Sequence, residues 1–88
     1  MNATHHAVLF ALFDLAKYDR HATIGRLVEH PAVMDLGLDR AAVLRALAAL
    51  DKAGLADHER VRLTMNGLPL ALVLGAPKSR RNTVRRAA

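Results

Sequence analysis

Five histidines are the side chains of this sequence most able to bind a metal ion: His5, His6, His21, His30 and His58. Asp19 and Asp57 could add carboxylate ligands to such a group. A helical zinc motif places two histidines four residues apart on one helix face, and no two of these histidines have that spacing. The chain also lacks cysteine, so it has no thiolate ligand. We therefore expect no metal site and no cofactor.

Side chains suited to nucleophilic catalysis are equally scarce. Ser79 is the only serine and there is no cysteine, so the usual sets of nucleophile and base are absent. The acidic residues are scattered, with no pair spaced for general acid–base catalysis. No glycine-rich phosphate loop is present either. The sequence predicts a binding protein and not an enzyme.

Positive charge is concentrated at the C-terminal end. Residues 1–77 carry eight basic and eight acidic side chains and are neutral overall. Residues 78–88 have no acid and five basic residues, namely Lys78, Arg80, Arg81, Arg85 and Arg86. Such a segment attracts polyanions, nucleic acid among them, or serves only as a solubilising end. We expect one domain over residues 1–77 and a flexible basic tail over residues 78–88.

The composition indicates a small globular protein. The chain has 88 residues, of which 52% are hydrophobic and 24% charged, and this length suits a single domain. No apolar run approaches the roughly 20 residues of a membrane span, and the N-terminus does not read as a signal peptide. We expect a cytoplasmic protein that makes no membrane contact.

Apolar periodicity predicts three helices in the first part of the chain. The first spans residues 5–18 with Thr4 as its cap, and its inward positions are Val8, Leu9, Leu12, Leu15 and Ala16. The second follows Thr23 and runs over residues 24–30, since Pro31 disfavours helical geometry before it. Residues 31–38 form a turn with room for a short helical piece. Asp39 caps the third helix, residues 40–53, whose buried stripe is Val43, Leu44, Leu47 and Leu50.

A short hairpin and an ambiguous apolar segment follow. The alternation of Val61 and Leu63 with basic residues predicts strands over residues 55–58 and 60–64, with a turn around His58 and Glu59. Asn66-Gly67 is a hairpin-turn sequence that could join strands 60–65 and 68–74. We prefer an apolar helix over residues 68–74, capped by Thr64 or Asn66 and stopped by Gly75 and Pro77.

The order of these elements is that of a helix-turn-helix with a wing. Three stretches resemble winged helix-turn-helix transcription regulators of the MarR, ArsR and PadR groups: ATIGRLV at 22–28, LDRAAVLRAL at 38–47 with LDKAGL at 50–55, and VRLT at 61–64 with Gly67. The resemblance covers roughly residues 20–75. It implies a mainly α fold with a short β-hairpin: a three-helix core, a wing and a possible C-terminal helix.

The resemblance also implies binding to double-stranded DNA, with helix 40–53 in the major groove. Arg45 is the expected base-reading residue, because a guanidinium group pairs with guanine O6 and N7. The basic tail would run along a neighbouring groove. The implied contacts are Arg40, Ala41, Ala42, Arg45 and Lys52 in the groove, Thr23 and Arg26 on phosphate, and His58, Arg60 and Arg62 of the wing on the backbone or minor groove.

We therefore expect a transcription regulator or nucleoid-associated factor. A homodimer is expected because one small chain would struggle to cover the apolar first and last segments. Two other functions remain open. The Ala-rich helix or segment 68–74 could bind a protein partner whose acidic surface meets the tail, which the neutral body favours. Alternatively, the wing and tail could bind structured RNA by its shape.

Overall fold

The computed structural model describes residues 2–18 and 20–77, which form five helices and one two-stranded antiparallel sheet. A mainly α fold with a short hairpin is therefore confirmed. The short helical piece expected after Pro31 is also present. In chain order the elements are α1 (Ala3–Lys17), α2 (Ile24–Glu29), α3 (Pro31–Met34), α4 (Arg40–Lys52), β1 (Ala56–Asp57), β2 (Arg62–Leu63) and α5 (Gly67–Leu74).

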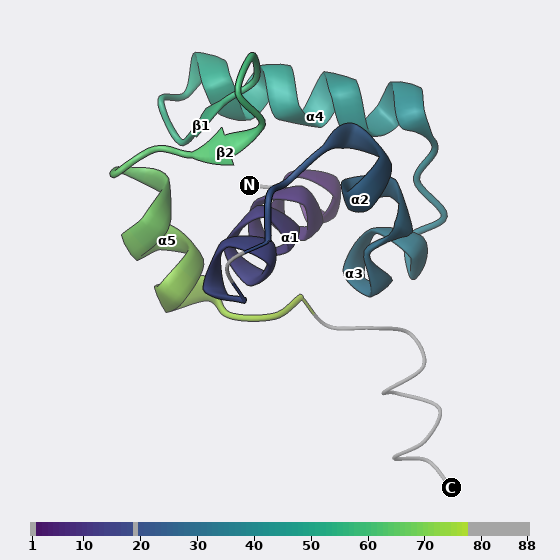
Figure 1. Ribbon diagram of the computed structural model, residues 1–88, viewed down its shortest axis with the longest axis horizontal. Helices are drawn as coiled ribbons and strands as arrows, with labels where there is room; N and C mark the ends of the chain where they lie inside the picture. The colour runs from purple at the N-terminus through teal and green to yellow at the C-terminus, as the bar shows by residue number, and fades with distance from the viewer. Residues whose placement is uncertain (1, 19, 78–88) are drawn as a thin grey trace, which may run out of the picture.

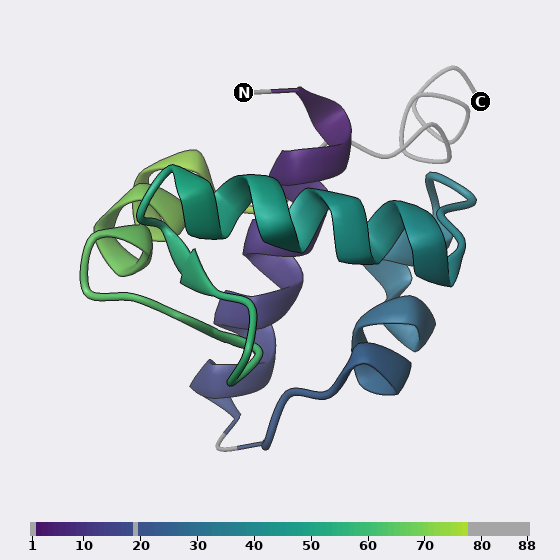
Figure 2. The ribbon, with the colours of Figure 1, turned by 90° about the horizontal axis from the view of Figure 1, so that it is seen from above.

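Helix α1 lies at the centre of the fold, and the other elements pack around it. Helix α4 crosses over α1, with α2 and α3 on one side and α5 on the other (Figures 1 and 2). The largest fully buried side chains are five leucines of α1, α2 and α4, namely Leu9, Leu12, Leu27, Leu47 and Leu50. Five apolar residues of α1 are buried within the chain, namely Ala7, Val8, Leu9, Ala11 and Leu12.

Side-chain caps fix where the helices begin. Thr23 Oγ1 accepts a hydrogen bond from the N–H of Arg26, and Asp39 Oδ1 accepts one from the N–H of Ala42, as predicted for α2 and α4. The prediction of Thr4 as the cap of α1 is wrong, because Asn2 Oδ1 accepts from the N–H of His5 at 2.8 Å. Asparagine is at least as good a cap as threonine, so the helix begins at Ala3.

Two predicted buried stripes differ in detail from the structure. Leu44 is 44% exposed, whereas Ala46 is buried in its place. The stripe of α4 is therefore centred on the face that holds Val43, Ala46, Leu47 and Leu50, at the i, i+3, i+4, i+7 spacing of a packed helix. In α1, Leu15 is only partly buried and Ala16 is exposed, while Ala7 and Ala11 are buried because neighbours contact α1 on several sides.

The hairpin is shorter than predicted, with a longer turn. Ala56 pairs with Leu63 and Asp57 with Arg62, so residues 58–61 form the turn. Asp57 Oδ1 accepts from the backbone N–H groups of Glu59 and Arg60 and thereby organises the start of the turn. Val61 has a φ of 53°, and this left-handed conformation returns the chain into β2.

The last apolar segment is a helix, as we preferred, and begins at Gly67. Thr64 Oγ1 accepts from the N–H of Gly67 at 3.2 Å, while the Asn66 side chain makes no capping bond. Gly75, with a φ of 63°, ends the helix. Within the described residues, no helix is both long and apolar enough to cross a membrane.

Candidate nucleic-acid interface

The outward side of α4 carries a row of small and basic side chains. Ala41, Arg45, Ala48 and Lys52 are spaced three or four residues apart and therefore share one helix face. All four are exposed, and their face lies opposite the buried stripe of the helix. We call these four residues the outer stripe. Its two alanines, Ala41 and Ala48, lie on either side of Arg45, and Lys52 lies at the C-terminal end of the stripe.

The predicted contacts Arg40 and Ala42 lie on opposite flanks of the outer stripe. At about 100° per residue, Arg40 shares the flank of Asp51, and Ala42 falls on the other flank. Asp51 is bonded to the hairpin, so Arg40 lies on the hairpin side of α4. Ala42 is half-buried, and its N–H is used by the cap of the helix. The structure thus does not bring Ala42 together with the other groove residues.

Asp51 attaches the hairpin turn to α4. Its Oδ2 accepts from the backbone N–H of His58 at 2.9 Å and from the ring Nδ1–H at 2.5 Å. The side-chain hydrogen bond to Asp51 raises the pKa of His58 above its ordinary 6.5. The backbone hydrogen bond from His58 lowers the pKa of Asp51 below its ordinary 3.8. A protonated His58 is therefore paired with a carboxylate, and this predicted contact adds no net positive charge.

Two arginines of the hairpin lie beside the connection between α1 and α2. Arg60 and Arg62 border a cavity of about 170 Å³ together with Arg20 and His21. The same hairpin arginines border a second cavity with His21 and Thr23. We call Arg20, His21, Arg60 and Arg62 the hairpin cluster.

Arg20 and His21 were not predicted to be neighbours of the hairpin. They belong to a connection some forty residues away in the chain. The two segments meet only because β2 packs against α1. No local sequence signal could have revealed this proximity.

Most of these basic side chains have no acidic partner. Among residues 2–18 and 20–77, no acid lies within ion-pair distance of Arg45, Lys52 or Arg62. Arg60 Nε is 3.9 Å from Asp57, and its side chain is 68% exposed, so this pair contributes little stability. The charges of Arg45, Lys52 and Arg62 are thus available to an anionic ligand.

The two expected phosphate contacts of α2 also have structural roles. Thr23 caps the helix through Arg26, as described above, and Arg26 Nη1 donates to the carbonyl of His21 at 2.7 Å. This bond fixes the connection that leads into α2. Both residues are exposed, so the hydroxyl of Thr23 and the other N–H groups of Arg26 remain accessible to solvent.

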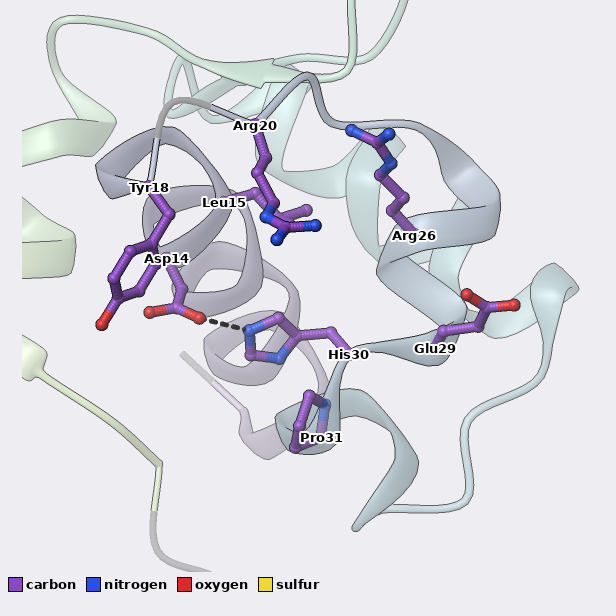
Figure 3. A pocket seen from close by; sticks show the side chains of 8 residues that line it. All are labelled: Asp14, Leu15, Tyr18, Arg20, Arg26, Glu29, His30 and Pro31. Atoms are coloured by element: carbon purple, nitrogen blue, oxygen red, sulfur yellow. Dashed lines mark hydrogen bonds and ion pairs between the residues drawn. The ribbon is translucent and has the colours of Figure 1, made fainter.

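The histidines are spread over the fold and make separate contacts. His30 is 8% exposed, and its Nδ1 accepts from the N–H of Ala32, so the ring proton lies on Nε2 and is donated to Asp14 at 2.8 Å (Figure 3). Both ring nitrogens are thus used within the fold, leaving none for a metal or a reacting proton. His30 caps α3, a role that its place directly before Pro31 could have indicated. Across the described parts of the chain, no three His, Asp or Glu side chains form a group that could hold a metal ion.

The predicted contacts of the tail, Lys78, Arg80, Arg81, Arg85 and Arg86, lie outside the described residues. Ser79 lies there as well. Comparison with protein-family models, with curated proteins and with solved structures gives no significant match for this chain. Its likeness to winged helix-turn-helix regulators therefore remains a resemblance of sequence pattern.

Proposed function

We propose that this chain binds double-stranded DNA as a winged helix-turn-helix domain and acts as a transcription regulator or nucleoid-associated factor. The observation that carries the proposal is the outer stripe of α4, an exposed helix face with basic and small side chains and no acid. A hairpin bearing two further arginines is bonded to the same helix through Asp51. In this proposal α2 to α4 form the helix-turn-helix, and the hairpin is the wing.

The dimensions of α4 suit the major groove. An α-helix with its side chains is about 10–12 Å across, close to the groove width of about 12 Å, so small outward side chains favour deep entry. Arg45 lies near the middle of the outer stripe, between Ala41 and Ala48. It is therefore the residue that we assign to base reading, and Lys52 and Arg40 are assigned to phosphate.

The hairpin cluster would hold the neighbouring backbone. Arg60 and Arg62 are exposed, and Arg20 borders the same cavity, so three guanidinium groups can reach phosphate from one place. Lys52 and Arg40 would supply two further contacts. Each neutralised phosphate changes the slope of log K against log salt by about 0.9, so five contacts predict a slope near −4.5 for residues 1–77. The basic residues of 78–88 would make the slope of the full chain steeper.

The hairpin turn also carries a negative charge that the proposal must accommodate. Glu59 is exposed and borders a cavity with Arg60 and Arg62. If this turn faces the DNA backbone, the Glu59 carboxylate repels phosphate. Replacing Glu59 with Gln is therefore expected to strengthen duplex binding, most clearly at low salt. Unchanged affinity would contradict placement of the turn at the backbone.

The test is duplex-DNA binding by fluorescence anisotropy over about 50 to 200 mM salt. Arg62→Ala is expected to weaken binding to all sequences and to reduce the salt slope by about 1. Lys17→Ala removes the same charge from α1, where the amine lies over the Tyr18 ring, and serves as the matched control. Equal effects of the two variants would show that only total charge matters and would refute the assigned surface.

A second arm tests base reading at Arg45 on a duplex selected from a random library. Arg45→Ala is expected to cost about 1–3 kcal/mol on the selected duplex and less on an unrelated one. Arg45→Lys keeps the charge but loses the planar pair of donors, so it should restore binding only in part. If Arg45→Lys restored binding fully, Arg45 would be assigned to phosphate contact and not to base reading.

A further inference from the structure

A cavity of about 360 Å³ lies where the C-terminal end of α1, the connection to α2 and the junction of α2 with α3 meet (Figure 3). Ligand pockets in proteins measure roughly 300–1,000 Å³, so this one has room only for a small molecule. Its lining holds two basic and two acidic side chains whose charges cancel, namely Arg20, Arg26, Asp14 and Glu29. The apolar part of the lining is Leu15, Pro31 and the ring of Tyr18.

The Asp14 carboxylate is oriented by a buried neighbour and keeps one oxygen free. Its Oδ2 accepts from the Nε2–H of His30 at 2.8 Å. The His30 ring is held in turn by the N–H of Ala32 and by an edge contact with the Phe10 ring. Oδ1 accepts no hydrogen bond from the described residues, and 31% of the Asp14 side chain is exposed. The cavity therefore offers a fixed carboxylate oxygen to a donor that enters from solvent.

Arg20 brings an opposite charge to the same cavity. Figure 3 shows its side chain pointing from the connection toward the His30 ring. Within residues 2–18 and 20–77, no acid lies at ion-pair distance from Arg20. Arg26 adds a second positive charge, but its Nη1 is already bonded to the carbonyl of His21 at 2.7 Å. Arg20 and Asp14 thus line one cavity without pairing with each other.

The two unpaired charges select the class of ligand. A simple anion such as phosphate would meet the carboxylates of Asp14 and Glu29, and a simple cation would meet two guanidinium groups, so repulsion disfavours both. A small zwitterion avoids this, because its carboxylate can accept two parallel N–H bonds from Arg20 while its ammonium group donates to Asp14 Oδ1. The apolar lining suits a hydrocarbon side chain. We propose that this cavity binds a free α-amino acid with an apolar side chain.

The experiment is an NMR titration of the full chain with L-leucine, followed through the backbone amide signals. The signals of Leu15, Arg20 and His30 should shift and saturate, with a Kd of about 1 mM or tighter. Two analogues test the two charges: 4-methylpentanoate is leucine without its ammonium group, and 3-methylbutylamine is leucine without its carboxylate. Each analogue should bind at least about tenfold more weakly, because it loses one charge-assisted hydrogen bond.

Three variants assign each charge to its residue. Arg20→Gln should weaken leucine binding at least about tenfold and remove the preference for leucine over 3-methylbutylamine. Asp14→Asn keeps an acceptor oxygen for His30 but loses the charge, so it should remove the preference for leucine over 4-methylpentanoate. Arg45→Gln is the matched control, since it removes the same charge as Arg20→Gln from α4, outside the cavity. It should bind leucine like the unmodified chain.

Three outcomes would overturn the proposal. The first is the absence of saturable shifts at these residues up to about 10 mM leucine, tenfold above the weakest expected Kd. The second is equal weakening by Arg20→Gln and Arg45→Gln. The third is equal binding of leucine and 4-methylpentanoate, which would assign the cavity to simple carboxylates. Arg20 also belongs to the hairpin cluster, so the titration contains no DNA, and its failure leaves the proposed DNA contact untouched.

Discussion

Because α5 approaches the hairpin closely at Gly67, we expect Gly67→Ala to destabilise the fold. By helix propensity alone, alanine in place of glycine in a helix stabilises it by up to about 1 kcal/mol. In this structure the new Cβ would lie 1.9 Å from the Leu55 carbonyl oxygen and 2.9 Å from the Leu55 carbonyl carbon. Even a weak C–H···O contact requires about 3.3 Å between carbon and oxygen, so α5 would have to move by more than an ångström.

This displacement of α5 should lower the free energy of unfolding. Overpacking costs about 1–3 kcal/mol and occasionally more, and contact with backbone belongs at the upper end. A loss of about 3 kcal/mol is a large part of the roughly 5–15 kcal/mol that stabilises a domain. At about 4–8 °C for each kcal/mol, the Tm should fall by roughly 12–24 °C.

The assay is thermal unfolding followed by far-ultraviolet circular dichroism, with Gly25→Ala as the control. Gly25 lies within α2, and its new Cβ would meet only Thr23 Oγ1, at 3.9 Å. Gly25→Ala should therefore stabilise the chain by about 0.5–1 kcal/mol and raise its Tm. The two substitutions are thus expected to change the Tm in opposite directions. A Gly67→Ala chain that melts at or above the unmodified Tm would refute the packing described for α5.

Three further predictions concern hydrogen bonds that hold the fold. Because the pKa of His58 is raised, its bond to Asp51 stabilises the fold below about pH 6.5 and less as the pH rises through that pKa. Because the pKa of Asp51 is lowered, the same stabilisation is lost as the pH falls below about 3.8. The stabilisation by this bond is therefore greatest between these two pH values. In Asp51→Asn, the His58 pKa measured by NMR titration should move back toward 6.5, and an unchanged value would contradict the pairing. Asp14→Ala leaves the buried Nε2–H of His30 without its acceptor and should lower the free energy of unfolding, measured in urea, by about 1–3 kcal/mol. Asp14→Asn keeps an acceptor oxygen and should cause a smaller loss. Equal losses for the two variants would exclude the assigned bond. Thr23→Ala should lower the free energy of unfolding by about 1 kcal/mol in the same assay, whereas Thr23→Ser keeps the capping hydroxyl. If serine destabilises the chain as much as alanine does, the capping bond is refuted.

The elements that the sequence predicts well are those whose signals are local. Thr23 and Asp39 cap α2 and α4 because each side chain needs only the N–H three residues ahead. The end of α5 at Gly75 likewise follows from a residue that tolerates a positive φ. The exposed arginines of the hairpin follow from alternation with Val61 and Leu63, which are partly buried.

The features that escaped prediction depend on contacts between distant segments. The bond between His30 and Asp14 joins residues sixteen apart, and neither residue type requires the other. Leu44 is exposed against expectation, and Ala46 is buried, because the position of α1 beneath α4 decides which face is covered. In α5, Gly67 and Ala71 are buried while Leu72 and Val73 are exposed. The close approach of Gly67 to Leu55 favours this orientation, and hydrophobic periodicity does not encode that approach.

We propose that α4 and the hairpin bind duplex DNA without help from residues 78–88. The most direct measurement is duplex affinity against salt for the full chain and for a chain ending at Ala76, with circular dichroism to show that the shorter chain is folded. We expect the shorter chain to bind, with a salt slope near −4.5 that is shallower than that of the full chain. Loss of all duplex binding in a folded chain ending at Ala76 would refute this proposal and assign the affinity to residues 78–88.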